Sequence, residues 1–190
     1  MINKAFLNFL VILLTLVYLI SLTGCASMSE GQCHTADWSQ VGFNDGNAAT
    51  GSRIDAHYDS CSEYGIRVDQ QQYRQGYSQG LRNYCTPRNG WARGSTGRTY
   101  SNFCAADLEG SFLSAYGAGK DYFRMQQDIH VLTDKKVSLE ERAVAEGTGL
   151  TREDKMEFLR QADMIKNEID GLIYDSSNLM ERARNNGWSY

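Results

Sequence analysis

Apolar residues recur at alternating intervals of three and four through the last third of this 190-residue chain. Such spacing aligns the residues in one stripe along a helix, as in a coiled coil. Gly147 and Gly149 interrupt the pattern, and Thr151 with Asp154 has the spacing of a capping box. The sequence therefore predicts an all-α fold with an antiparallel helical hairpin over 120–190. The two stripes consist of Tyr122, Met125, Ile129, Leu132, Lys136, Leu139 and Ala143, and of Phe158, Ala162, Ile165, Ile169, Leu172, Ser176, Leu179 and Ala183.

A charged residue near the start of the chain, Lys4, is followed by an almost continuous apolar run over 6–20. This order is typical of a secretory signal peptide. The run ends in Leu22-Thr23-Gly24-Cys25, which resembles a bacterial lipobox. The resemblance implies a signal peptide over 1–24, a diacylglyceryl thioether on Cys25 and an acylated amino terminus. An uncleaved membrane anchor is the alternative, because the run is nearly long enough to span a bilayer.

The residue after the lipobox cysteine is Ala26 rather than Asp, which resembles an outer-membrane sorting signal. We therefore expect a protein attached to the cell envelope by lipid, on the periplasmic face of the outer membrane. Two or three acyl chains anchor a protein stably where one chain does not. Residues 25–32 are expected to form a short, polar, lipidated tether.

The charge of the mature chain excludes one class of partner. Removing 1–24 removes only Lys4 among the charged residues and leaves 18 basic and 23 acidic side chains, a net charge of −5. An acidic chain of this kind lacks the basic surface of a nucleic-acid-binding protein, so no nucleic acid is expected as a partner.

Four cysteines remain once Cys25 is assigned to lipid. An even number in an exported chain favours two disulfides, for which three pairings are possible. A zinc site is the alternative, but the sequence contains no CxxC or HxxxH pair, so no metal or other cofactor is expected. The four residues are Cys33, Cys61, Cys85 and Cys104.

Helix signals favour one of the three pairings. Thr35 is the expected N-cap of a helix over 36–50, and a second helix is expected over 53–64. If these two helices are antiparallel, Cys33 before the first meets Cys61 near the end of the second.

The other two cysteines flank a glycine-rich segment. A third helix is expected from Asp69 to Cys85, and a fourth after Cys104. The segment between them is expected to be a loop that a bridge would hold. We therefore predict the disulfides Cys33–Cys61 and Cys85–Cys104.

Composition changes near residue 120. Residues 26–119 include 13 Gly, seven Arg and no Lys, whereas 120–190 include four Gly, five Lys and 14 acidic residues. We expect a disulfide-stapled helical domain rich in Gly and Tyr over 33–119, followed by the hairpin.

A glycine motif recurs in the first part. Residues 42–46 and 76–80 both read Gly, aromatic, two variable residues, Gly, and 116–119 is a degenerate third copy. Glycines four apart lie on one helix face and allow another backbone to approach closely. The aromatic side chains near these faces are expected to fill the core; they are Trp38, Tyr73, Tyr84, Phe112 and Tyr116. The alternative is that the 11 Tyr and three Trp of the chain, many in this part, form a groove that stacks sugars.

A spaced set of residues extends over about 33–123. It consists of Cys33, Asp37, Trp38, Gly42, Asp45, Gly46, Cys61, Tyr73, Gly76, Gly80, Leu81, Tyr84, Cys85, Asn89, Gly90, Gly94, Gly97, Tyr100, Cys104, Phe112 and Tyr116. This spacing resembles domain-of-unknown-function family 2799, an uncharacterised family of bacterial lipoproteins. One departure is Ala105, where similar sequences have Pro after the cysteine. The resemblance implies no activity, ligand or catalytic residue.

Four other patterns have simpler structural explanations. The GxSxG at Ser78 matches a hydrolase elbow but follows a polar helical segment instead of a buried strand. Residues 93–98 offer two arginines to an anion, although a tight turn explains them as well. His57 is interpreted as a structural histidine. The scattered spacing of Asp37, Asp45, Asp55 and Asp59 indicates helix caps and arginine partners.

These patterns predict a non-enzymatic, lipid-anchored envelope protein whose 120–190 hairpin binds a protein partner. A lipoprotein that binds glycan or peptidoglycan is the alternative function.

Overall fold

The computed structural model describes residues 27–147 and 149–189. The signal peptide and the lipidated Cys25 predicted above lie outside these residues. The described part contains seven α-helices and no strand, which confirms the all-α class. The helices are α2 (Glu30–Thr35), α3 (Trp38–Ala48), α4 (Ile54–Ser62), α5 (Gln70–Tyr84), α6 (Pro87–Ser95), α7 (Ala106–Val144) and α8 (Arg152–Asn185).

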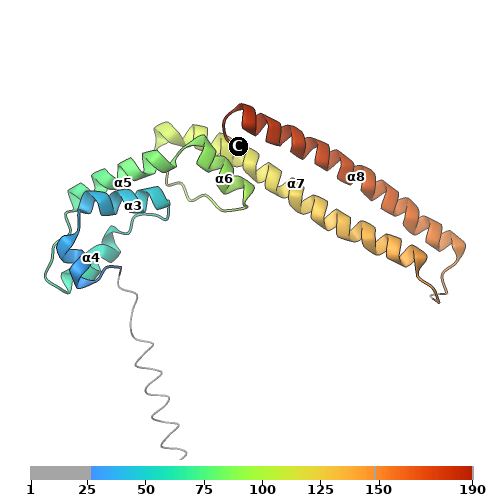
Figure 1. Ribbon diagram of the computed structural model, residues 1–190, viewed down its shortest axis with the longest axis horizontal. Coiled ribbons are helices and arrows are strands. Elements are labelled where there is room, and N and C mark those ends of the chain that lie inside the picture. Colours follow the sequence, from blue (N-terminus) through green and yellow to red (C-terminus); the bar gives the residue numbers. More distant parts are fainter. Residues whose placement is uncertain (1–26, 148, 190) are drawn as a thin grey trace, which may run out of the picture.

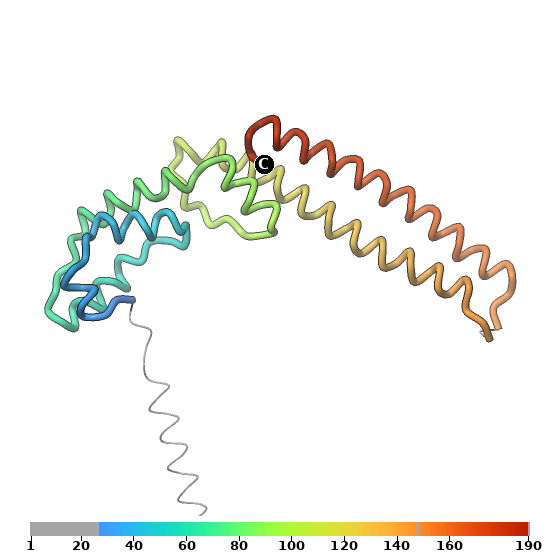
Figure 2. Tube along the Cα trace, in the orientation of Figure 1, coloured from blue at the N-terminus to red at the C-terminus, as the bar shows by residue number. Residues whose placement is uncertain are grey.

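The helices form a row of three packed pairs: α3 with α5, α6 with α7, and α7 with α8. Figure 1 shows the result as an elongated, bent molecule. The described chain begins beside α4 at one end, and the loop between α7 and α8 lies at the other. Figure 2 shows α7 running beside α6 in its first part and beside α8 in the rest, so α7 joins two of the three pairs.

The first helices differ in detail from the sequence prediction. The N-cap of α3 is Asp37, whose carboxylate accepts from the backbone N–H groups of Ser39 and Gln40. Thr35 is instead the last residue of α2, and its hydroxyl donates to the carbonyl of Gly31. The predicted tether was partly wrong, because its last residues fold into α2 behind a capping box at Ser29.

The packing partner of α3 also differs from the prediction. It packs on α5, not antiparallel on α4, which lies across the end of the pair (Figure 1). The α5 helix begins after its N-cap Asp69 and ends before Cys85, close to the predicted limits. The glycines of α3 and α5 explain this choice of partner, as described below.

The predicted loop between Cys85 and Cys104 contains a further helix, α6. Thr86 caps it through its hydroxyl, and Pro87 occupies the first turn, where a missing N–H costs little. Gly90 and Gly94 lie four residues apart in this helix and are both buried. The high glycine content of this segment favours a loop, whereas the spacing of four residues between Gly90 and Gly94 places both on one face of a helix.

The long hairpin follows the predicted apolar stripes. Helix α7 has 39 residues and α8 has 34, so they extend about 58 and 51 Å. Helix α7 begins at Ala106 and continues without interruption through residue 119, where the composition changes. In α8, Ile165 and Ile169 are buried, and Thr151 forms the predicted capping box with Asp154.

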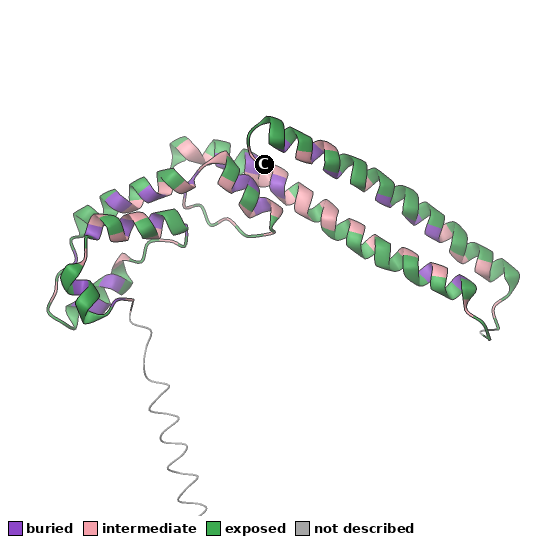
Figure 3. Cartoon of the chain, viewed as in Figure 1, coloured by how far each residue is buried: buried purple, intermediate pink, exposed green. Residues whose placement is uncertain are grey.

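The cores are small and lie along the row of helix pairs. Figure 3 shows the buried residues as a narrow line on facing surfaces, with exposed residues covering the outer faces. One cluster surrounds Tyr73 and Cys61, one surrounds Phe112, one surrounds Trp91 with Leu179, and one surrounds Leu139 with the α8 stripe.

Candidate functional site

The two predicted disulfides are present. Cys33 in α2 is bonded to Cys61 in α4, with Cα atoms 5.6 Å apart. Cys85 at the end of α5 is bonded to Cys104, shortly before α7, with Cα atoms 5.7 Å apart. The bridges span 28 and 19 residues, and in the chain-entropy description each stabilises the fold by about 3 to 4 kcal/mol.

The repeated glycine motif forms the contact between α3 and α5. A Cβ added to Gly42 would overlap the carbonyl oxygen of Tyr73, and one on Gly46 would overlap that of Tyr77. Gly76 and Gly80 meet the carbonyls of α3 in the same way, at Ser39 and Phe43. The two copies of the motif therefore face each other, and each helix packs its backbone against the other.

A second pair of this kind joins α6 and α7. Gly90 and Gly94 face the carbonyl oxygens of Phe112 and Tyr116. From the opposite side, a Cβ on Gly119 would lie 2.6 Å from the carbonyl oxygen of Trp91. The degenerate third copy of the motif thus contributes Gly119 to a helix contact. Its partners across the contact are the two glycines of α6, Gly90 and Gly94.

A buried polar network lies beside the first disulfide. Asp45 Oδ2 accepts from the hydroxyl of Tyr73 at 2.7 Å and lies 2.8 Å from Nε2 of His57. The Tyr73 hydroxyl also accepts the backbone N–H of Arg53 at 3.0 Å. Burial first, and then the bond to Asp45, raises the pKa of Tyr73 to about 12. Asp45 was expected to pair with arginine, and its partners are instead a histidine and a tyrosine.

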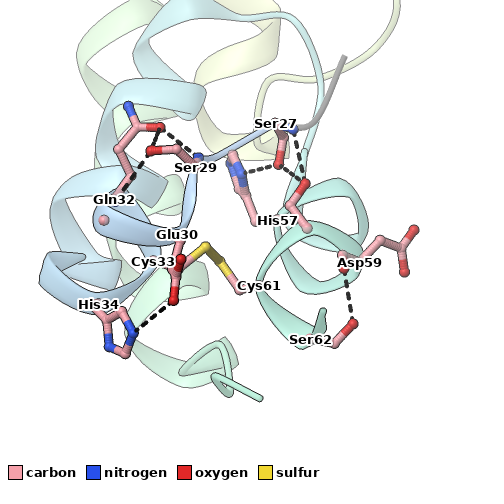
Figure 4. The surroundings of a disulfide bond; sticks show 12 residues. Ser27, Ser29, Glu30, Gln32, Cys33, His34, His57, Asp59, Cys61 and Ser62 are labelled. Atoms are coloured by element: carbon pink, nitrogen blue, oxygen red, sulfur yellow. Dashed lines mark hydrogen bonds and ion pairs between the residues drawn. A yellow bond between two sulfur atoms is a disulfide. The ribbon is translucent and has the colours of Figure 1, made fainter. Parts of the chain in front are cut away.

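The same network holds the first described residue of the chain. Ser27 Oγ lies 3.0 Å from Nδ1 of His57 and donates to the carbonyl of Ala56 at 2.8 Å. Its backbone N–H donates to Ser60 Oγ at 2.9 Å. Figure 4 shows Ser27 and His57 together above the Cys33–Cys61 bridge. Both ring nitrogens of His57 therefore have partners, as expected of a structural histidine.

The family comparison matches the part of the chain that contains the two glycine contacts. Residues 37–121 match the family described as protein of unknown function, DUF2799. The match covers 85 of the 190 residues and agrees with the resemblance found in the sequence, and we call residues 37–121 the DUF2799 segment. No curated protein and no solved structure matches the chain.

The DUF2799 segment contains α3 to α6 and the first part of α7, so it includes both glycine contacts and the disulfide Cys85–Cys104. It also includes Asp45, His57 and Tyr73 of the buried network. The first disulfide joins the segment to α2 through Cys33, which precedes the match.

Ser78 of the GxSxG sequence lies within α5 of the DUF2799 segment and is exposed. The two glycines beside it pack against α3, which accounts for the pattern. No nucleophile elbow exists at this position, because the elbow is a turn between a strand and a helix.

The four aspartates considered above serve separate structural roles. Asp37 caps α3, Asp45 belongs to the network with His57, and the four aspartates do not come together. Within 27–147 and 149–189 no group of three or more metal-ligating side chains is found. No helix among these residues is both long and apolar enough to cross a membrane.

Proposed function

We propose that this protein is a non-catalytic interaction protein, anchored by lipid in the bacterial cell envelope, in which the DUF2799 segment supports a projecting helical hairpin. The observation that carries the proposal is the distance between the two ends. Ser27, two residues after Cys25, is held at one end of the molecule, and the loop between α7 and α8 lies at the other (Figure 1).

The hairpin surface supports a protein partner. Several large apolar side chains on the outer faces of α7 and α8 are exposed, although the seam between the helices is filled. Exposed apolar side chains that gather on one surface are typical of an association face, and these eight all lie on the two helices of the hairpin. They are Val131, Val137, Val144, Met156, Leu159, Met164, Ile173 and Tyr174.

Glycan binding receives less support from the aromatic residues. Trp38, Tyr73 and Phe112 are buried, and Tyr84 and Tyr116 are half-buried. The Phe112 ring lies against those of Tyr84 and Tyr116. Trp38 and Tyr73 belong to one core cluster, so these five rings fill cores and leave no row of free faces for sugars. A pull-down with purified sacculi tests this alternative, because retention that survives high salt would favour it.

Anchoring is tested by Cys25→Ser. We expect the variant to lose metabolic labelling with palmitate and to accumulate as an unlipidated precursor, because the thioether cannot form. Palmitate label that persists in the variant would exclude lipid attachment at Cys25.

The partner surface is tested by photocrosslinking in cells. A photoreactive amino acid at Met164 on the hairpin should give a discrete crosslinked product, whereas the same group at Tyr58 in α4 should not. Both positions are exposed, by 63% and 48%, so exposure alone does not distinguish them. A product at Tyr58 but not at Met164 would place the partner on the DUF2799 segment instead.

A further inference from the structure

A cleft of about 450 Å³ lies where the end of α3 meets the segment that follows α6. Its first wall is the chain just after α3, and its second wall comes from the C-terminal part of α6 and from 98–103. This volume is in the range of sites that hold small molecules. The lining residues are Ala48, Ala49, Thr50, Gly51, Arg93, Arg98, Ser101 and Phe103.

The charge of this lining differs from that of the whole chain. The chain has 23 acidic side chains against 19 basic ones, yet the cleft is lined by two arginines and no carboxylate. Two hydroxyl side chains, Thr50 and Ser101, complete the polar part of the lining. All four side chains are hydrogen-bond donors, and an arginine fork matches a carboxylate or phosphate.

Arg93 is held in place by the protein. Its Nε donates to the carbonyl of Thr99 at 2.6 Å, and Nη1 donates to the Tyr84 hydroxyl at 3.2 Å. The guanidinium also lies 5.2 Å from the centre of the Phe103 ring. No carboxylate is among these contacts, so the charge of Arg93 is positioned but not neutralised by them.

The other donors of the cleft have no partner within the described chain. The side chains of Arg98, Thr50 and Ser101 form no hydrogen bond or ion pair with residues 27–147 or 149–189. Arg98 is exposed and is fixed through its backbone, whose N–H donates to the Arg93 carbonyl and whose carbonyl accepts from Tyr116. These groups are free to bind a ligand.

Backbone strain is concentrated at the same place. Within the described residues only two non-glycine residues have positive φ, Ala49 at 52° and Asn102 at 51°. Ala49 lines the cleft, and Asn102 lies between its lining residues Ser101 and Phe103. Left-handed backbone is unfavourable for alanine, and residues held in it cluster at binding sites.

We propose that this cleft binds an oxyanion, a phosphate or a carboxylate, carried by a molecule about the size of a monosaccharide. Arg93 supplies the fixed positive charge, Arg98 closes on the anion from the exposed side, and the hydroxyls of Thr50 and Ser101 donate to the same oxygens or to the body of the ligand.

Titration of the full-length protein with three sugars tests the proposal. Glucose 6-phosphate and glucuronate carry the two oxyanions, and glucose carries none. We expect one or both anionic sugars to shift the NMR signals of the cleft residues, whereas glucose does not. The stronger of the two identifies the anion. Equal binding of glucose, or no binding of either anionic sugar at millimolar concentration, would overturn the proposal.

Arg98→Gln and a matched control locate the site. Loss of one charged donor should weaken binding about tenfold. Arg67→Gln removes the same charge from an exposed position outside the cleft and should leave the affinity unchanged. Equal losses in both variants would indicate attraction by overall charge only, and no loss in Arg98→Gln would also contradict the site. Because Arg98 is exposed, unchanged thermal melting is expected in both variants.

Discussion

Single glycine residues control how closely the helices approach, and two neighbours in α7 allow this to be measured. Gly119 faces the backbone of α6, whereas a Cβ on Gly117 would meet no atom within 4 Å. We expect Gly119→Ala to lower the free energy of unfolding by about 1 to 3 kcal/mol, because the backbones must separate. Chemical denaturation measures this change.

Gly117→Ala is the matched control in the same helix. It should raise the free energy of unfolding by about 0.5 to 1 kcal/mol, because alanine loses less backbone entropy in a helix than glycine. If Gly119→Ala also raised the free energy of unfolding, helix propensity would outweigh backbone contact at Gly119.

Tyr73 links the buried network to alkaline stability. Its pKa of about 12 exceeds the ordinary value of 10.0, so the folded state retains the proton at pH values where the unfolded state releases it. The stabilisation from Tyr73 is therefore complete below pH 10 and is lost as the pH rises from 10 to 12. The pKa values of Tyr77 and Tyr100 are also raised above the ordinary value. Absorbance of tyrosinate should therefore show a component titrating near pH 12 that is lost in Tyr73→Phe.

The stability of the two proteins gives a second measurement. The difference in free energy of unfolding between the native chain and Tyr73→Phe should decrease between pH 9 and pH 11. A constant difference across this range would show that the Tyr73 hydroxyl titrates at its ordinary pKa in the folded protein.

Among the helices, α8 depends on one stripe of side chains. Ile169 is 9% exposed and Ile173, one turn later, is 47% exposed. We expect Ile169→Asp to cost at least about 3 kcal/mol, because it removes buried apolar surface and desolvates a charge, whereas Ile173→Asp should cost far less. Hydrogen exchange should show the loss of protection over 129–172 in Ile169→Asp, with α3 and α5 still protected. Similar exchange in the two variants would contradict the claim that Ile169, and not Ile173, packs between α7 and α8.

The helical limits of α5 and α8 were predictable from sequence because each has a local signal that no distant contact overrides. Asp69 and Thr151 cap their helices, and the α8 stripe is regular over seven turns. The partner of α3 was not predictable from the cysteines, because a disulfide constrains two residues and not the helix axes. The glycine motifs indicate the partner of α3, because two helices with glycines at the same spacing can pack backbone against backbone.

The buried network and the cleft were beyond sequence reasoning for a different reason. Asp45, His57 and Tyr73 are 12 to 28 residues apart, and no periodic pattern relates them. Arg93 and Arg98 were recognisable as a pair, but the chain that follows α3 completes the cleft from 40 residues away. Helix α6 is not evident from the sequence, because a high glycine content is typical of loops and here the glycines serve helix packing instead.

At the scale of the whole molecule, separate cores predict separate stabilities. The cluster around Cys61 and Tyr73 shares no buried residue with the one around Leu139 and Ile165. Replacing Cys33 and Cys61 together with serine should therefore remove about 3 to 4 kcal/mol from the end that contains α2 and α4. Exchange in 129–172 should remain as in the native chain. Uniform acceleration over all helices would indicate a single cooperative unit.

The continuity of α7 sets a physical scale for the molecule. From Lys120 to Val144 the helix contains no glycine or proline, so it has none of the usual residues at which a helix bends sharply. This part acts as a stiff lever about 37 Å long, on which a tilt of about 10° at its start moves the far loop by about 6 Å. Removing seven residues from each arm would keep the same faces in register and shorten the reach by about 10 Å. The number of residues in the hairpin thereby sets the distance between the DUF2799 segment and the loop that joins α7 to α8.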